Sequence, residues 1–387
     1  MSQSVLIAGV GMSAFVPLGA GDSVAALAGR AIRQALDDAR IDYDLVDQVF
    51  SACVSSAVGC TEQVLAQIGL TGVPVFSLAD GCTAASSALQ LARHSVLSGQ
   101  AECALALGFE CMPANVTHRA FFGLDDSAPQ AWDGLGQPDA CQAHFARREH
   151  PAALFAAQTS WLLTRMGVAQ SSFEQVLSQA RNKAMLNPMA VLNRCTALDG
   201  WRARYLCPPA SGAAAVLLCT PGFLARYGAR GGVAVRACVR GSDLASEQES
   251  GCVLDVLGRA TTRRVAQLAY EHAGIGADEI EAVELHDQSV GDFMVYSAAL
   301  GLCREEGIDG FVRERRNSRG TPVDVCSSGG LLGRGHAPGA TGLAQITELV
   351  WQLRGTAPSR HDNGVRTALA HNTALGRSVS VTILQRT

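Results

Sequence analysis

Residues 327–342 read SSGGLLGRGHAPGATG, a glycine-rich turn that carries one histidine, His336. The letters that follow, LAQITELVWQLRG, place apolar residues at intervals of three and four, so we expect a long amphipathic helix after the turn. A histidine on such a rigid and open turn can act as the general base for a cysteine or as an oxyanion donor. A structural or helix-capping role for His336 is the alternative.

A cysteine suited to that base lies in DGCTAASSAL, residues 80–89. Cys82 stands between a strand-like run and a run of small residues, so we expect it at or near a helix N-terminus. Free N–H groups and the helix dipole there stabilise a thiolate, which would lower the thiol pKa from about 8.5, and they can also hold an oxyanion. Cys82 is therefore a candidate nucleophile; the alternative is one more packed cysteine among thirteen.

Two more polar segments follow directly on apolar, strand-like runs. ELHDQSV places His286, Asp287 and Gln288 at the end of one run, and AHNTALG places Asn372 at the end of another. Polar tips at the ends of strands in related sheets converge on one cleft. We therefore expect these side chains to lie near the cysteine and the histidine of the glycine-rich turn.

The order of the expected elements occurs twice. Each half reads as a strand, a helix, a strand entered through an acidic turn, a second turn and helix, and a closing strand rich in alanine. This repeat predicts two similar sheets packed about a pseudo-twofold axis, although any α/β chain offers some alternation. The expected opening strands cover 4–12 and 231–239, and the expected closing strands cover 102–110 and 365–376.

The segment between the two halves breaks this pattern. It mixes a loop rich in Asp, Gly and Pro with helical runs, and it is predicted to lie over one face as an insertion. The predicted units are an N-terminal half at 1–115 completed by 201–225, a loop domain at 116–200, and a C-terminal half at 226–387.

With these motifs the chain resembles the thiolase superfamily, most closely the sterol-carrier-protein-type thiolases. The resemblance runs nearly end to end through LALGFE, LCPPASGAAAVLL, ELHD, ALGLC, SGGL, GATGLAQ and the final HN. It implies an α/β fold of two βαβαβαββ halves in a five-layer αβαβα arrangement with an inserted loop domain. It also implies a dimer that acts on acyl-CoA thioesters, with no metal and no permanently bound cofactor.

The resemblance also assigns roles position by position. Cys82 matches the family nucleophile that becomes acylated, and His336 matches the histidine that activates it and helps to form an oxyanion hole. His286 matches the first residue of the family's His-Asp-Cys-Phe signature, which lines the same hole, with Asp287 as the second. Asn372 matches the asparagine of the terminal His-Asn motif near a second oxyanion site.

The third position of that signature departs from the family. There the family has a cysteine that acts as acid and base on the second substrate, whereas this chain has Gln288, which cannot exchange a proton near neutral pH. Cys326, where the family typically has asparagine, is a possible substitute acid/base, with a buried structural cysteine as the alternative. Lys183, in the inserted segment, is a possible contact for a substrate phosphate.

Three functions follow from these residues. The favoured one is an acyltransferase or condensing enzyme that takes an acyl group from a CoA or carrier-protein thioester onto Cys82, then passes it to a second substrate in a biosynthetic pathway. The second is a degradative 3-ketoacyl-CoA thiolase. The third is a vestigial subunit that binds acyl groups or a partner, since related assemblies pair such a subunit with a small OB-fold protein.

Composition excludes several other classes. The net charge of −4 gives no electrostatic footprint for nucleic acid or an anionic membrane, and no apolar stretch is long enough to span a bilayer. The cysteines form no CxxC pair, so we expect reduced thiols and no metal site. Neither end shows a targeting signal, and the expected location is cytoplasmic.

Overall fold

A computed structural model describes residues 4–20, 22–55, 59–112, 151–194, 205–228, 232–358 and 364–387. Its strands form one ten-stranded sheet in the order β3-β2-β4-β5-β1-β6-β10-β9-β7-β8. The strands of the first half are β1 (Leu6–Met12), β2 (Gln48–Ala52), β3 (Val75–Leu78), β4 (Cys103–Glu110) and β5 (Gly212–Cys219). Those of the second half are β6 (Val233–Ser242), β7 (Ala282–Glu284), β8 (Asp324–Val325), β9 (Thr367–Thr373) and β10 (Ser378–Arg386).

The strand order is a palindrome, which confirms the predicted duplication, but the two halves are joined in one sheet and not in the two separate sheets predicted. Read outward from the seam between β1 and β6, the two halves run 1-5-4-2-3 and 6-10-9-7-8, so each strand has a counterpart five numbers later. The directions match as well: β5 is antiparallel to β1 and β4, as β10 is to β6 and β9, while β2 and β7 are each parallel to both of their neighbours. The seam itself is one antiparallel pair, Leu6 with Ala234.

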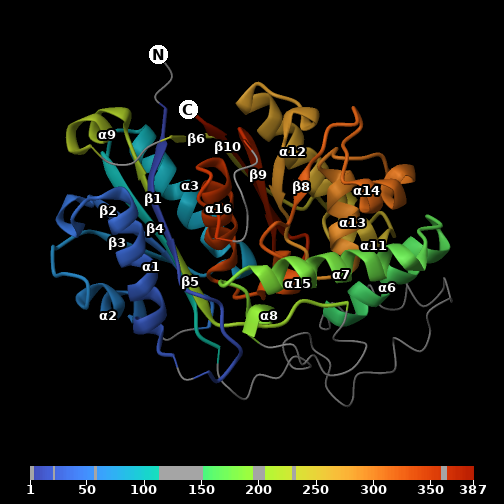
Figure 1. The fold of residues 1–387 in the computed structure, drawn as a ribbon, viewed down its shortest axis with the longest axis horizontal. Helices are drawn as coiled ribbons and strands as arrows, with labels where there is room; N and C mark the ends of the chain where they lie inside the picture. Colours follow the sequence, from blue (N-terminus) through green and yellow to red (C-terminus); the bar gives the residue numbers. More distant parts are fainter. Residues whose placement is uncertain are drawn as a thin grey trace.

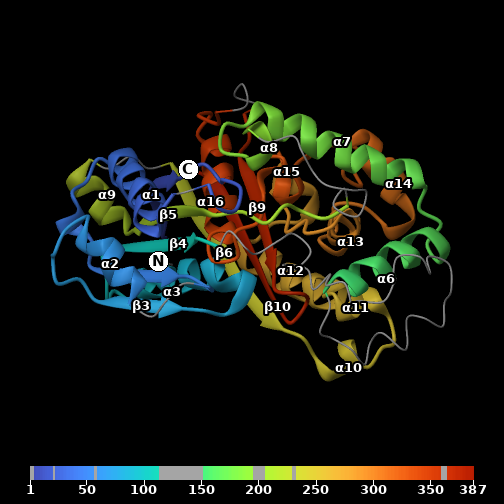
Figure 2. The ribbon, with the colours of Figure 1, turned by 90° about the horizontal axis from the view of Figure 1, so that it is seen from below.

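Helices cover both faces of each half and give the expected five layers (Figures 1 and 2). On the outside, α1 (Val24–Ala39) packs on β1, β4 and β5, and α12 (Arg259–Ala273) packs on β6 and β10. Between the halves lie α3 (Ala84–Leu97) and α16 (Thr341–Leu353), which contact each other. Because α16 also contacts strands of both halves, it belongs to the central layer.

The residues of each element fit its layer. The outer helix α1 buries one stripe at three- and four-residue spacing and starts at Ser23, whose side chain accepts a hydrogen bond from the Ala26 N–H. Gly9 and Gly11 of β1 let this helix approach, because a Cβ at either position would collide with the α1 backbone. The central helix α16 is instead buried on almost every side, because it packs between the two halves of the sheet.

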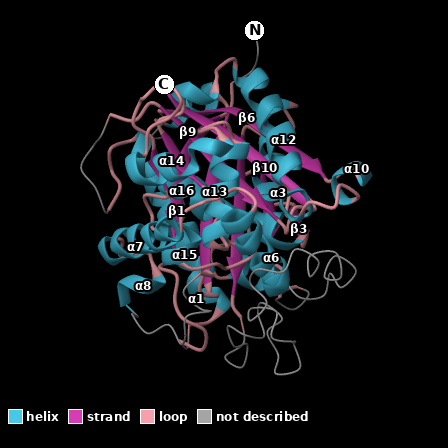
Figure 3. Cartoon of the chain, turned by 90° about the vertical axis from the view of Figure 1, so that its right-hand side faces the viewer, coloured by secondary structure: helices cyan, strands magenta, loops and turns pink. Residues whose placement is uncertain are grey.

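The inserted segment lies against the second half. It contains α6 (Pro151–Thr164), α7 (Gln170–Leu186) and α8 (Val191–Arg194). Both α7 and α8 contact α15 (Gly330–Arg334), and Figure 3 shows these three helices side by side. The predicted loop-domain residues 116–150 and 195–200 lie outside the described part of the chain, so the domain boundaries stay a prediction.

The remaining helices have ten residues or fewer. They are α2 (Cys60–Ala66), α9 (Pro221–Tyr227), α10 (Ala245–Gln248), α11 (Val253–Val256), α13 (Val290–Ala299) and α14 (Ile308–Glu314). Among the helices of the described ranges, none is long and apolar enough to cross a bilayer.

Candidate active site

Cys82 lies in a 3-10 turn, Gly81–Thr83, that joins β3 to the first turn of α3. The turn depends on Gly81, whose φ of +67° is a left-handed conformation that glycine adopts without strain. Cys82 is half-buried. Its Sγ lies 3.3 Å from Nε2 of His336, from which it is separated by 254 positions in the sequence. The structure thus brings together the two residues with which the sequence argument began.

The turn around His336 is fixed by its backbone and by Thr341. The His336 N–H donates to the carbonyl of Pro208 at 2.9 Å, and its carbonyl accepts from Ala210 at 2.9 Å. Thr341 Oγ1 donates to the Ala337 carbonyl at 3.0 Å, so it must accept at the 2.8 Å contact with His336 Nδ1. Nδ1 therefore carries the ring proton, and the lone pair of Nε2 faces the thiol of the cysteine.

His286 reaches the same place from the end of β7. Its ring meets that of His336 edge to face, with centroids 5.0 Å apart. Asn372 Nδ2 donates to His286 Nδ1 at 2.8 Å, while Asn372 Oδ1 accepts from Ser86 at 3.1 Å. The proton of His286 therefore lies on Nε2, which is buried and finds no hydrogen-bond partner within the described ranges of the chain. An unused N–H donor at this position is suited to an oxyanion.

Cys82, His286 and His336 form one cluster. A sulfur or ring nitrogen of each residue lies within 4.8 Å of the others. Sulfur and imidazole nitrogen atoms are ligands that zinc accepts. A nucleophilic cysteine requires the same arrangement, with its thiol in hydrogen-bonding distance of a histidine nitrogen that carries no proton. Of the three residues, Cys82 alone is not fully buried.

Burial sets the charge state of this cluster. It raises the pKa of Cys82 to about 12, with the Glu110 carboxylate adding to the effect, and it lowers the pKa of His336 to about 3. Burial and the neighbouring His336 hold the pKa of His286 well below its ordinary value. The expectation of a lowered thiol pKa was wrong, because loss of water around the sulfur outweighs the N–H groups at the start of the helix. The resting pair is a neutral thiol beside a neutral imidazole.

Gln288 is buried beside His286 and shapes the local backbone. Its N–H donates to the His286 carbonyl at 3.1 Å, and its own carbonyl accepts from Cys207 at 2.8 Å. The Gln288 side chain slightly favours a charged His286, raising its pKa against the larger effect of burial. Asp287 acts on another segment, because its Oδ1 accepts the Leu331 N–H at 2.7 Å and so holds the start of α15.

The residue after Gln288 has a structural task that the sequence argument missed. Ser289 caps α13, accepting the Asp292 N–H at 2.9 Å, and donates to Gln158 Oε1 of α6 at 2.9 Å. Gln158 also donates to Asp292 at 2.9 Å, so three buried side chains link the inserted segment to the helix that follows the signature. A Ser-x-x-Asp spacing before an apolar run is the signal that could have revealed this cap.

Two predicted site residues are used elsewhere. Cys326 Sγ accepts the Leu285 N–H at 3.5 Å, and burial raises its pKa well above the ordinary value. This favours the structural interpretation of Cys326 over a proton shuttle. Lys183 Nζ donates to the Val325 carbonyl at 2.6 Å and lies 3.3 Å from Asp324, which favours an internal tie to β8 over a phosphate contact.

The sequence matches one protein family along both halves. "Thiolase, N-terminal domain" covers residues 5–128, and "Thiolase C-terminal domain-like" covers residues 245–386. Sterol carrier protein 2 of Homo sapiens is 33% identical, over 98% of this chain and 72% of that protein. Benzoylsuccinyl-CoA thiolase subunit BbsB of Thauera aromatica is 26% identical, over 97% of this chain and 96% of that protein.

Solved structures share the fold at lower identity. An Ltp2-ChsH2(DUF35) aldolase gives a TM-score of 0.74 at 22% identity, covering 99% of this chain and 98% of that chain. Human mitochondrial 3-ketoacyl-CoA thiolase gives 0.71 at 15% identity, covering 100% and 99%. The palindromic sheet, the cysteine and histidine cluster and these similarities agree: the chain belongs to the thiolase family and stands close to its sterol-carrier-protein-type members.

Proposed function

We propose that this protein is a thiolase-like acyltransferase that uses Cys82 as its nucleophile. The donor is a CoA or carrier-protein thioester, no cofactor is permanently bound, and the acceptor is a second substrate in a biosynthetic pathway. The observation that carries the proposal is the 3.3 Å contact between Cys82 Sγ and His336 Nε2, with the ring tautomer that accepts the thiol proton.

The first half-reaction follows from the protonation states at the site. As Sγ attacks the thioester carbonyl, the thiol proton moves to His336 Nε2 and the carbonyl oxygen becomes an oxyanion. The N–H at Nε2 of His286, which no described residue engages in a hydrogen bond, is a donor for that oxyanion. Collapse breaks the bond to the departing thiolate, which takes the proton back from His336. The product is an acylated Cys82 and a free thiol.

The second half-reaction is limited by Gln288. The cluster at the sulfur consists of Cys82, His286 and His336, and the signature position that supplies the second acid or base in the family holds Gln288. A glutamine cannot remove a proton from the α-carbon of an incoming thioester. We infer an acceptor that supplies its own nucleophile, either a carbanion released by loss of CO₂ or a hydroxyl or amine.

The proposal includes a homodimer in the cytoplasm. β3 ends the sheet and pairs with β2 alone among the described strands, and it exposes Phe76 to 46%. An exposed sheet edge of this kind is a ready surface for a second copy. A small partner subunit or an acyl carrier protein is the other proposed contact, and the fold shared with an Ltp2-ChsH2(DUF35) aldolase supports testing such a partner.

Intact mass measurement tests the proposal directly. The purified protein is incubated with a panel of acyl-CoA thioesters and with the same acyl groups on a carrier protein, and we expect the mass of one acyl group to be added. Cys82→Ala should abolish the adduct, whereas Cys60→Ala, which removes another half-buried thiol, should not. No adduct with any donor would refute the proposal, and CoA-dependent cleavage of a 3-ketoacyl-CoA would instead favour a degradative thiolase.

A further inference from the structure

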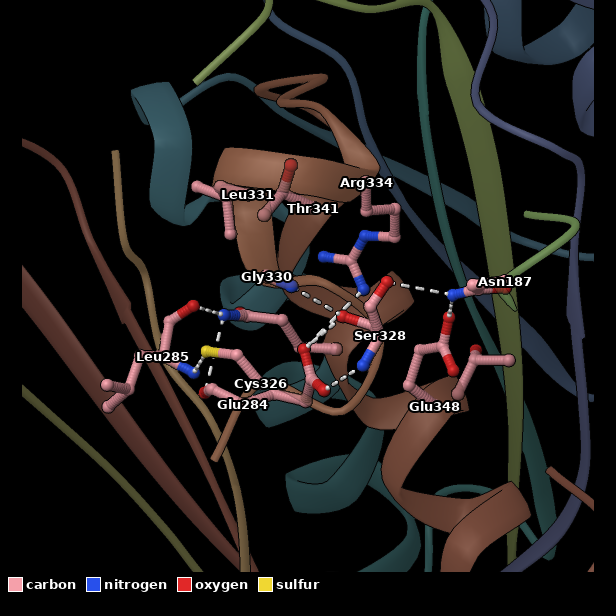
Figure 4. A network of polar contacts seen from close by, with 12 residues as sticks. Asn187, Glu284, Leu285, Cys326, Ser328, Gly330, Leu331, Arg334, Thr341 and Glu348 are labelled. Carbon is pink, nitrogen blue, oxygen red and sulfur yellow. Dashed lines mark hydrogen bonds and ion pairs between the residues drawn. The ribbon is translucent and has the colours of Figure 1, made fainter. Parts of the chain in front are cut away.

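Two charged side chains stand in matching positions beside the site histidines. Arg334 precedes His336 by two residues, and Glu284 precedes His286 by two residues. Their charged ends meet, with Arg334 Nη1 3.9 Å from Glu284 Oε2, and both side chains are fully buried (Figure 4). One ion pair therefore links the two segments that deliver the imidazoles to Cys82.

The acidic half of the pair is firmly held. Glu284 accepts the Ser328 hydroxyl at 2.6 Å and the Ser328 N–H at 3.1 Å. The same hydroxyl oxygen accepts the N–H of Gly330, the first residue of α15, at 3.1 Å. The carboxylate on β7 is thereby connected to the start of the helix whose last residue is Arg334.

The basic half is held by charge rather than by hydrogen bonds. Among the residues that the structure describes, none is a hydrogen-bond partner of the three guanidinium nitrogens of Arg334, and the group lies 5.4 Å from the centre of the Phe15 ring. A buried cation with unused donors is costly, and its attraction to Glu284 is what offsets the cost. Removing either charge alone would leave the other fully buried and without its ion-pair partner.

The other charged groups around the pair are few. Glu348 of α16 has a pKa raised to about 7, by burial first and then by Glu284, and it accepts the Asn187 amide at 2.8 Å. Asp287 is also buried, with its pKa raised. Lys183 of α7 contributes a second positive charge that acts on Glu284.

The cation also bears on the imidazoles. After burial, Arg334 is the charged group that lowers the pKa of His336. On His286 it acts together with the rings of His336 and His371. A positive charge next to both rings makes a second positive charge on either of them unfavourable.

We propose that Arg334 and Glu284 are positioning residues: a buried ionic clamp that fixes His336 and His286 relative to each other, with a cationic half that opposes protonation of either ring. The catalytic role of the clamp rests on the proposed function. The clamp itself can be tested by measurements that use no acyl thioester.

A double-mutant cycle tests the clamp through Cys82 alkylation by iodoacetamide, followed at that residue by peptide mass mapping. Arg334→Met or Glu284→Met alone leaves the other charge without its partner and displaces a histidine segment, and misplacement by 1 Å can cost on the order of 100-fold in rate. We therefore expect iodoacetamide to alkylate Cys82 much more slowly in each single variant than in the unchanged protein, by a large part of that factor. The double variant Arg334→Met/Glu284→Met, which strands nothing, should recover most of the rate.

A matched control separates the clamp from general loss of buried charge. Arg354 pairs with Asp38 at 2.5 Å in another part of the fold, so Arg354→Met should leave Cys82 alkylation within about threefold of the unchanged protein, as for well-separated sites. If the effects of the two single substitutions simply multiply in the double variant, the clamp is refuted, whether or not the protein is later found to transfer acyl groups.

A second readout reports charge and not packing. Histidine ring signals are followed by NMR against pH and assigned with His336→Gln and His286→Gln. In Arg334→Met the His336 signal should titrate at a higher pH, with the ratio of charged to neutral ring changed about tenfold or more at a given pH. Arg334→Lys should restore the original behaviour, and Glu284→Gln should not raise the titration. An unchanged His336 titration in Arg334→Met would overturn the electrostatic half of the proposal.

Discussion

The charge state of Cys82 and His336 determines how acylation begins. With the thiol pKa raised to about 12 and the imidazole pKa lowered to about 3, neither group changes charge across the ordinary range of pH. The proton must then cross the 3.3 Å between them during the attack itself. We expect the single-turnover acylation rate, measured by rapid quench and mass spectrometry, to be flat from about pH 5 to 9.

Replacing the proposed base, His336, tests its contribution to the acylation rate. His336→Gln keeps a polar side chain at the site and removes the proton acceptor, so acylation should slow by roughly 10²- to 10⁴-fold. Cys82→Ser should fail altogether. A rate that falls as the pH drops through the ordinary histidine pKa would show that His336 becomes protonated there, and it would contradict the lowered pKa of this imidazole.

Gln288 makes a separate prediction at the same scale. Because this side chain cannot exchange a proton, the protein should not exchange the α-protons of a bound acyl-CoA with deuterium from the solvent. Gln288→Cys introduces a group that can, and we expect deuterium to enter the α-carbon, as read by the mass of the recovered acyl-CoA.

Gln288→Asn is the matched control, since it changes the side chain without adding a titratable group. It should show no exchange above the rate without protein. Exchange by the unchanged protein would mean that another residue supplies the second acid/base, and the inferred class of acceptor would then be wrong.

At the scale of elements, one side chain of α16 joins the two strands that carry His286 and Asn372. Gln345 Nε2 donates to the carbonyl of Leu285 after β7 at 2.8 Å and to that of His371 in β9 at 3.0 Å. Gln345→Ala leaves buried carbonyls unsatisfied, so we expect a loss of about 1–3 kcal/mol in the free energy of unfolding, measured with denaturant.

The same substitution should also slow acylation, because the hydrogen bond between Asn372 and His286 depends on the spacing of those strands. Gln352→Ala, in the last turns of the same helix, removes an equal side chain that none of these strand contacts uses. It should cost less stability and leave acylation unchanged. Equal losses of stability in both variants would argue against a special role for Gln345.

Local patterns were sufficient for the regular elements and insufficient for the contacts between them. The expected strands at 102–110 and 231–239 match β4 and β6, because apolar runs between turns have a local cause. The five-residue helix α15 inside the glycine-rich turn was not expected. It is held by Asp287, 44 positions earlier in the chain, and no local rule describes such a contact.

For the candidate site, the residues could be predicted from the sequence, but their protonation states could not. Its members could be named from polar tips on strand-like runs and from the family resemblance, and the structure brings Cys82, His286 and His336 together. The tautomer of His336 depends on Thr341, and the raised pKa of the thiol depends on burial by several elements. Both are properties of packing, so a rule about helix N-termini gave the wrong direction for the thiol.

At the scale of the whole molecule, the duplication explains why nucleophile and base meet. In the palindrome β3 corresponds to β8, and each leads to a helix of the central layer, β3 through a short turn and β8 through a longer segment that contains α15. Cys82 lies in the turn after β3 and His336 in the longer turn after β8, so the two residues occupy related places in the two halves. Because α3 and α16 contact each other, their starts bring the two turns to one point.

The same arrangement ties the site to the sheet edge and leads to a prediction about assembly. β3 is at once the exposed edge strand and the strand that leads into the turn of Cys82, so a second copy paired at this edge would steady the nucleophile. Phe76→Asp places a charge on the exposed side of β3. We expect it to convert a dimer to a monomer in sedimentation analysis and to slow acylation.

Leu268→Asp, which charges a similarly exposed apolar position on α12, should do neither. A Phe76→Asp protein that remains dimeric, or an unchanged protein that sediments as a monomer, would show that this edge does not form the subunit interface.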